Sequence, residues 1–449
     1  MNFQTINLYL KKNCLILSLI FIFIISRLLI FNFDIKPDPK WINLMQHINL
    51  KLLKEDLLGS IFYFHSQPPM WNFIIGIGVK FFGANSIKIS YFILFINLLS
   101  SISIIFISIK TLELIKINKT KIFFLILILI ILSPSIIFYE NFLSYAHFTC
   151  LNIFLIKYYL IKLYKNYKFK YEIKIYLFVS ILVLTWSAYT ILFLIVIFSL
   201  ILPKTYLNFK KRSITLFIIF IILGNLPAIK NKVYFDFFTN STWLGIQASQ
   251  SLGYDRVEWT ICSYDLGNVK LYNHNFRIEN QNKKKLDHPM LNDGRYNDLG
   301  FLYRSKYCAS KINNHFFKNF KKLLFEKLNR FLSVHGHLSF DYLFKPLAWT
   351  KNFSYLEFLN LNQFFKINVF IFFMTIYTIF FILFIQSILK KNKDFIDFFI
   401  IANSFLYAYL ILISFFGGSW EQERMRYTEF SFIFYSIPII LKKLRIFNN

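Results

Sequence analysis

The 449-residue sequence is poor in charged residues, in acids and in cysteine. Only 16% of the residues are charged, while soluble domains usually carry about 25%, and 56% are hydrophobic. There are four cysteines, none with CxxC spacing, and two of them, Cys14 and Cys150, lie in apolar runs as small hydrophobic residues. No His/Cys cluster has the spacing of metal ligands, so we predict no required metal and no cofactor.

A signal-peptide cleavage site is also lacking. Lys11 and Lys12 precede an apolar run that extends to Phe31, which is long enough to span a bilayer, and no small-residue cleavage site follows it. We therefore expect an uncleaved first helix over about 14–30 that starts in the cytoplasm. No internal repeat of the kind found in inverted-repeat transporters is visible.

What the chain has instead is a series of apolar runs separated by lysine-rich segments. This pattern predicts an all-α polytopic membrane protein with about ten to eleven transmembrane helices. The expected segments lie at 14–30, 87–109, 122–139, 142–163, 175–202 (a short hairpin with its tip at 186–189), 214–229, 367–388, 395–416 and 430–441, while 70–82 is too short to span. The net charge of +28 resides largely in the short loops, so it indicates positive-inside topology and no nucleic-acid partner.

Three regions follow from this topology. Residues 1–230 form an N-terminal transmembrane module with a first outer loop at 33–69, residues 231–365 a mixed extracytoplasmic insert, and residues 366–449 the C-terminal helices. Both termini are expected in the cytoplasm. Cys262 and Cys308 lie in the insert, where a disulfide bond between them is one expectation and two free thiols the other.

Polar residues gather at the outer face under this topology. The acids, the histidine and the arginines that share this face are Asp34, Asp38, His65, Glu140, Glu421, Arg424 and Arg426. Acids and arginines that converge over a helical bundle suit a site that binds phosphate and activates a hydroxyl group; the alternative is that the loops simply carry solvated charges. Arg27 lies inside the first apolar run, where it either extends to the interface or pairs with an acid or a ligand phosphate.

The layout resembles the GT-C superfamily of membrane glycosyltransferases. Pro37, Asp38 and Trp41 are similar to the Pro-Asp-Glu-aromatic segment of the protein mannosyltransferase and aminoarabinose transferase branch, and His65, Pro68 and Pro69 to its His-x-x-Pro segment. The phrases at 139–145 (YENFLSY) and 423–427 (ERMRY) also look like those of bacterial members. Pro39 replaces the second acid of the branch's Asp-Glu pair.

The resemblance implies an inverting transfer of a sugar from a polyprenyl-phosphate donor to an extracytoplasmic acceptor, in the bacterial inner membrane. The acceptor is a glycan, a lipid or a protein, and membrane lipids surround the bundle. Asp38 or Asp34 would be the general base. The donor phosphate would meet Arg424, Arg426 or Arg27. The substrate-binding candidates are His65, Glu140, Tyr139 and Glu421.

Three other functions are consistent with the sequence. A lipid-linked oligosaccharide polymerase or ligase would depend on arginines more than on an aspartate after the first helix. A secondary transporter would place ionisable residues at mid-membrane, where Arg27 is the candidate that the sequence shows clearly. A non-catalytic assembly protein would not need acids that converge on a site.

Overall fold

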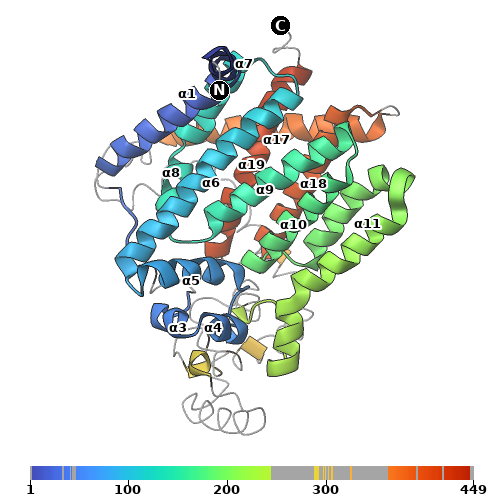
Figure 1. Cartoon of the computed structure of the whole chain (residues 1–449). Coiled ribbons are helices and arrows are strands. Elements are labelled where there is room, and N and C mark those ends of the chain that lie inside the picture. The colour runs from blue at the N-terminus through green and yellow to red at the C-terminus, as the bar shows by residue number, and fades with distance from the viewer. Residues whose placement is uncertain are drawn as a thin grey trace.

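The computed structural model describes residues 3–32, 35–40, 42, 47–243, 288–292, 297, 299, 302, 305–306, 324–325, 363–390, 393–416 and 419–444. Across these residues the regular secondary structure is helical, with no strand (Figure 1). The first helix, α1 (Phe3–Asn32), covers the expected segment 14–30. Its apolar part faces outward along much of its length, as expected of a helix in contact with lipid.

Short helices follow α1 at the end of the molecule opposite the two termini (Figure 1). They are α3 (Leu50–Glu55), α4 (Leu57–Tyr63) and α5 (Met70–Phe82), and α5 matches the predicted short apolar segment. Gly83 ends α5 with φ at 76°, a left-handed conformation that glycine adopts without steric cost. The long α6 (Ser86–Leu114) then crosses the bundle, and Asn85 caps its first turn by accepting the Lys88 N–H.

The expected continuous span at 122–139 is broken. It consists of α7 (Lys119–Ile126), the π-helical turn η1 (Leu127–Ile131) and α8 (Pro134–Asn141), with a bend of 51° between the parts. Pro134 explains the break, because its ring and its missing N–H prevent it from continuing a helix, whereas it is well suited to the first turn of α8.

The predicted hairpin at 175–202 is confirmed. α9 (Ala146–Lys165) is followed by α10 (Phe169–Thr185), and a tight tip leads into α11 (Ile191–Phe235). The rings of Phe198 and Phe217 stack 4.1 Å apart, whereas the same number of residues in a straight helix would separate them by roughly 28 Å. α11 therefore doubles back on itself between these residues, after Pro203.

The C-terminal helices are α17 (Gln363–Leu389), α18 (Phe395–Phe416) and α19 (Ser419–Lys443). The last helix, expected over 430–441, begins already at Ser419, so Glu421, Arg424 and Arg426 lie in its first turns and not in a loop. Glutamate, glutamine, methionine and arginine are good helix formers, so this polar stretch extends the helix although its composition resembles a loop.

Among the described residues, four helices are long and apolar enough to cross a membrane, or five if the bent pair α7–α8 counts as one span. Three shorter apolar helices accompany them, at 70–82, 191–203 and 374–389. The structure thus fits a multi-pass α-helical membrane protein, but the expected ten to eleven spans are not reached in the described part. Several helices fall short because they carry charges or are interrupted; α9, for example, contains Lys157 and Lys162.

The interior is divided into two hydrophobic cores by α9, which passes through the middle of the bundle (Figure 1). Ile153 and Ile156 on one face of α9 pack with Trp71, Trp186 and parts of α10, α11 and α18. On its other side Cys150 and Phe154 pack with α1, α6, α7 and α19. A small third cluster joins the end of α11 to the described residues of the insert, including Leu291 and Leu302.

The close packing of α11 against α10 predicts an effect of substitution at Gly224. A Cβ atom built there lies 3.4 Å from both Leu194 Cδ1 and Val183 Cγ1, so alanine fits and leucine does not. We expect Gly224→Leu to lower the unfolding free energy by about 1–3 kcal/mol and Gly224→Ala to have little effect. Thermal unfolding of the purified protein in detergent measures both, and a Gly224→Leu variant as stable as wild type would contradict this packing.

Candidate functional site

A buried ion pair joins α1 to α8. The Arg27 Nε atom donates to Glu140 Oε2 at 2.6 Å and Nη2 donates to Glu140 Oε1 at 2.9 Å, which is the bidentate geometry of a strong pair. Arg27 is 9% exposed and Glu140 is fully buried. Of the two roles predicted for Arg27 inside its span, the structure shows pairing with an acid.

Both hydrogens on Nη1 of Arg27 are also engaged. Nη1 donates to Ser26 Oγ at 3.0 Å and to the Ile131 carbonyl oxygen at 2.6 Å, and the guanidinium lies over the Phe23 ring. Ile131 ends the π-helical turn ahead of Pro134, where the broken helix leaves carbonyl oxygens without helical partners. A donor phosphate that accepted two hydrogen bonds from Arg27 would therefore have to displace one of these partners.

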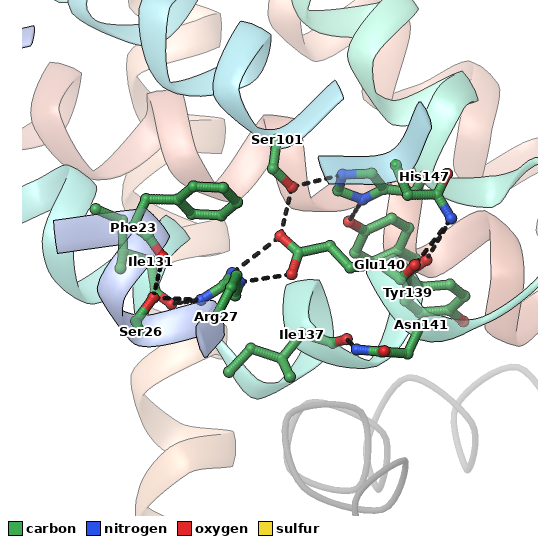
Figure 2. Close-up of polar contacts among 12 residues, drawn as sticks. Phe23, Ser26, Arg27, Ser101, Ile131, Ile137, Tyr139, Glu140, Asn141 and His147 are labelled. Carbon is green, nitrogen blue, oxygen red and sulfur yellow. Dashed lines mark hydrogen bonds and ion pairs between the residues drawn. The ribbon is translucent and has the colours of Figure 1, made fainter. Parts of the chain in front are cut away.

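A chain of hydrogen bonds continues from Glu140 into the bundle (Figure 2). Ser101 Oγ on α6 lies 2.5 Å from Glu140 Oε1 and 2.8 Å from His147 Nε2 on α9. His147 Nδ1 in turn lies 2.5 Å from the Tyr427 hydroxyl on α19. All four side chains are buried. We call the set Arg27, Glu140, Ser101, His147 and Tyr427 the polar network.

The positions of the hydrogens in this network follow from the ion pair at one end of it. Glu140, paired with Arg27, is an acceptor, so Ser101 donates its one hydrogen to the carboxylate. Ser101 Oγ then accepts from the Nε2–H of His147, and Nδ1 accepts from the Tyr427 hydroxyl. Because the serine lies between the acid and the imidazole, and not at the end of the chain, this is not the arrangement of a hydrolase triad.

Further contacts hold the end of α8 in place. Asn97 on α6 donates through Nδ2 to the Glu140 backbone oxygen at 3.0 Å. The Tyr139 ring stacks on the Tyr427 ring with centroids 3.9 Å apart, so the predicted substrate-binding Tyr139 packs inside the bundle. The network and these contacts together fix α1, α6, α8, α9 and α19 relative to one another.

Among the other predicted acids and arginines, only the side chain of Asp38 is described. Asp38 is exposed and accepts the Lys40 backbone N–H at 3.0 Å; no hydrogen bond or ion pair joins it to the polar network in the described part of the chain. Asp34 lies outside the described residues, as do Trp41, Cys262 and Cys308. Glu421, Arg424 and Arg426 belong to the first turns of α19, but their side chains are outside the description.

His65 is buried in a junction between the first outer loop and the insert. Its Nδ1 lies 3.0 Å from Thr242 Oγ1, and its Nε2 lies 2.9 Å from the Asn297 carbonyl oxygen. The Asn297 side chain accepts the backbone N–H groups of His65 and Ser66. Burial, together with the charge of the nearby Lys230, lowers the pKa of His65 to about 3. His65 is therefore neutral, and both of its ring nitrogens have hydrogen-bond partners. It connects the segment after α4 to Thr242 and Asn297.

Sequence reasoning missed Ser101, His147 and Tyr427, and it also missed a fully enclosed lysine, Lys157. A signal was present: His147 and Lys157 interrupt the apolar run at 142–163, and with Cys150 they lie on one face of a helix. Ionisable residues inside an apolar run are costly unless they meet partners, so such a face predicts a buried polar contact.

Comparisons with known proteins do not identify this arrangement of residues. The chain matches no protein-family model, no curated protein and no solved structure. Within the described residues, no three His, Cys, Asp or Glu side chains cluster in a way that could hold a metal ion.

The Arg27–Glu140 pair predicts strongly coupled effects of substitution. Glu140→Gln leaves a buried guanidinium without its counter-charge and should lower the unfolding free energy by about 3–5 kcal/mol. The double variant Arg27→Met/Glu140→Met should lose less than the sum of the single variants Arg27→Met and Glu140→Met. Unfolding free energies of wild type, the single variants and the double variant, measured in mixed SDS micelles, give the coupling energy of the pair. The half-exposed Lys110–Glu113 pair, at 3.2 Å, is the control and should couple by less than about 1 kcal/mol; additive effects at Arg27 and Glu140 would contradict the pairing.

His65 predicts a pH-dependent loss of stability. Its pKa is about 6.5 when unfolded and about 3 in the fold, so the unfolded chain binds the additional proton. Its contribution is complete above pH 6.5 and falls by up to about 1.4 kcal/mol per pH unit as the pH drops towards 3. We expect wild type to lose more stability than His65→Gln between pH 7 and pH 5 in detergent unfolding curves. Parallel curves for the two proteins would contradict a buried neutral imidazole.

Proposed function

We propose that this protein is a membrane glycosyltransferase that moves a sugar from a polyprenyl-phosphate donor to an acceptor hydroxyl group. The proposal rests on the resemblance of the first outer loop to GT-C enzymes and on one structural observation. The polar network ties the end of α1, which leads directly to Asp38, to the first turns of α19, which carry Arg424 and Arg426. The candidate base therefore follows one of the helices that these buried contacts hold together, and the two phosphate-binding candidates lie on another.

The distribution of basic residues supports an extracytoplasmic site. Lys442 donates to the Ile115 carbonyl oxygen, and Lys443 pairs with Asp397 at 2.8 Å. These contacts bring the end of α19 to the α6–α7 and α17–α18 connections, which also contain Lys116, Lys119 and Lys390. Such a basic end is cytoplasmic by the positive-inside rule. Asp38 follows the end of α1 that is farther from this basic end. By the same rule, this position supports a site at the outer face of a bacterial inner membrane.

The chemistry requires only groups that the chain provides. The Asp38 carboxylate takes the proton of the acceptor hydroxyl as its oxygen attacks the anomeric carbon from the face opposite the phosphate. The bond between that carbon and the phosphate oxygen breaks with inversion, and polyprenyl phosphate leaves. Arg424 and Arg426 neutralise the charge of the leaving phosphate. The polar network acts on this site by positioning the segments that bear these residues.

Substitution of Asp38 tests the proposal. In lipid nanodiscs that contain short-chain polyprenyl-phosphate sugars, with water as the acceptor, Asp38→Asn should lower the rate of polyprenyl-phosphate release about 10²–10⁴-fold, because it removes the general base. Glu55→Gln is the matched control, since Glu55 is also an exposed acid after α1, and it should leave the rate unchanged. Asp34→Asn, assayed in parallel, shows which aspartate is the base.

The same assay separates the nearest alternative. Undiminished release in both aspartate variants, together with loss in Arg424→Gln or Arg426→Gln, would replace the transferase by a lipid-linked oligosaccharide polymerase or ligase. No release by the wild-type protein from any polyprenyl-phosphate sugar would overturn the proposal.

A further inference from the structure

A cavity of about 570 Å³ lies where α9, α11 and α18 meet, at the end of the bundle that carries the basic connections (Figure 1). This volume is within the range of ligand pockets, about 300–1,000 Å³. The wall of the cavity is mostly apolar and comes from the first part of α11 and the start of α18. It includes Ile195, Val196, Leu200, Phe398, Ile401 and Phe405. None of these residues takes part in the proposed sugar transfer.

The cavity is open on a side of the bundle that faces lipid. Ile195 on α11 and Phe405 on α18 both line it, and they are 43% and 47% exposed. The inner side is closed by Tyr164 of α9, whose ring stacks on Phe398 and whose hydroxyl donates to the Leu200 carbonyl oxygen at 2.8 Å. Lipid tails are as apolar as these side chains, so a hollow that is open to the bilayer is filled by an acyl chain.

One charged group at the mouth of the cavity has no partner. The neighbouring lysines Lys390 and Lys443 both pair with Asp397, at 2.6 and 2.8 Å. Asp394 also lines the cavity, but it accepts two backbone N–H groups of the first turn of α18 at 2.8 Å and lies 3.6 Å from Lys390 Nζ. Lys393 lines the cavity as well, is exposed, and makes no hydrogen bond or ion pair within the described part of the chain.

The charges at this mouth therefore favour an anion. Both aspartates are neutralised by lysines or bound to the start of α18, which leaves the ammonium group of Lys393 in excess. The positive-inside rule places this basic end at the cytoplasmic face, where anionic phospholipids attract basic residues. The polyprenyl-phosphate donor of the proposed transfer would bind at the opposite end of the bundle.

We propose that this cavity binds one anionic phospholipid of the cytoplasmic leaflet, with an acyl chain between α11 and α18 and the phosphate against Lys393. The acyl chain moves from one apolar environment to another, so it contributes little to the choice between lipids. The headgroup makes that choice. Phosphatidylglycerol has a net negative charge that complements the unpaired ammonium group, whereas phosphatidylethanolamine brings an ammonium group of its own. The proposal is independent of the glycosyltransferase function.

Photolabelling tests this site. The full-length protein is placed in nanodiscs of phosphatidylcholine with a trace of phosphatidylglycerol that carries a diazirine on one acyl chain. After illumination, mass spectrometry of the peptides locates the label. In wild type the label should fall on the peptides that cover 191–203 and 395–405. It should be about fivefold more abundant there than with a phosphatidylethanolamine probe of the same acyl chains, which is the factor that one lysine near an anionic headgroup contributes.

Two variants separate the headgroup from the acyl chain. Lys393→Gln should bring the ratio of the two labelling yields close to one. Ser199→Phe, which places a ring in the cavity, should remove most of the labelling by both probes. The controls are Lys119→Gln, an exposed lysine at the same basic end, and Thr215→Phe, and both should label as wild type does. Ser199 and Thr215 each donate to the carbonyl oxygen four residues earlier on α11, so both phenylalanine variants lose the same kind of hydrogen bond.

Three results would overturn the proposal. The first is a wild-type protein that is not labelled on these peptides, or is labelled equally by the two probes. The second is an unchanged preference in Lys393→Gln or unchanged labelling in Ser199→Phe. The third is unlabelled polyprenyl phosphate that competes for the label more strongly than unlabelled phosphatidylglycerol, because the cavity would then belong to the sugar carrier.

Discussion

The buried ion pair between Arg27 and Glu140 is the constraint on which the arrangement of the bundle depends. A guanidinium group inside an apolar helix cannot remain without a counter-charge, and a carboxylate in the same place cannot either. Each group therefore limits where the other helix can lie. Because Ser101, His147 and Tyr427 extend the pair, the constraint passes from α1 through α6 and α9 to α19.

α9 is the element in which packing and polar chemistry meet. Two cores lie on its opposite sides, and His147 and Lys157 lie on the face that turns towards α19. Apolar contacts alone would allow α19 to slide along α9, since methyl groups and rings pack in more than one register. The hydrogen bonds of His147 and Lys157 to fixed positions on α19 select one register. The polar side chains thus determine the register of α19 on α9, and the hydrophobic contacts stabilise the packed helices.

The helical membrane class, the short α5, the α10–α11 hairpin and α18 could be predicted because each depends on local composition, length and flanking charge. The break at Pro134 could have been predicted from the proline itself, but the direction of the bend depends on the helices that pack around it. The start of α19 was missed because polar residues that continue a helix look like a loop when hydropathy is the only guide. The partners of Glu140 and Arg27 lay out of reach, since residues far apart in sequence meet only through the tertiary fold. Whether Asp38 faces Arg424 or Arg426 stays a prediction.

The junction around His65 has a consequence for how the protein is made. Thr242 and Asn297, which close over His65, follow it by 177 and 232 residues. The backbone of the Phe64–Gln67 segment, which is buried in the finished protein, is therefore synthesised long before its partners. The hydrogen bonds that bury this segment thus form only after the chain as far as Asn297, including α6 and α9, has been synthesised.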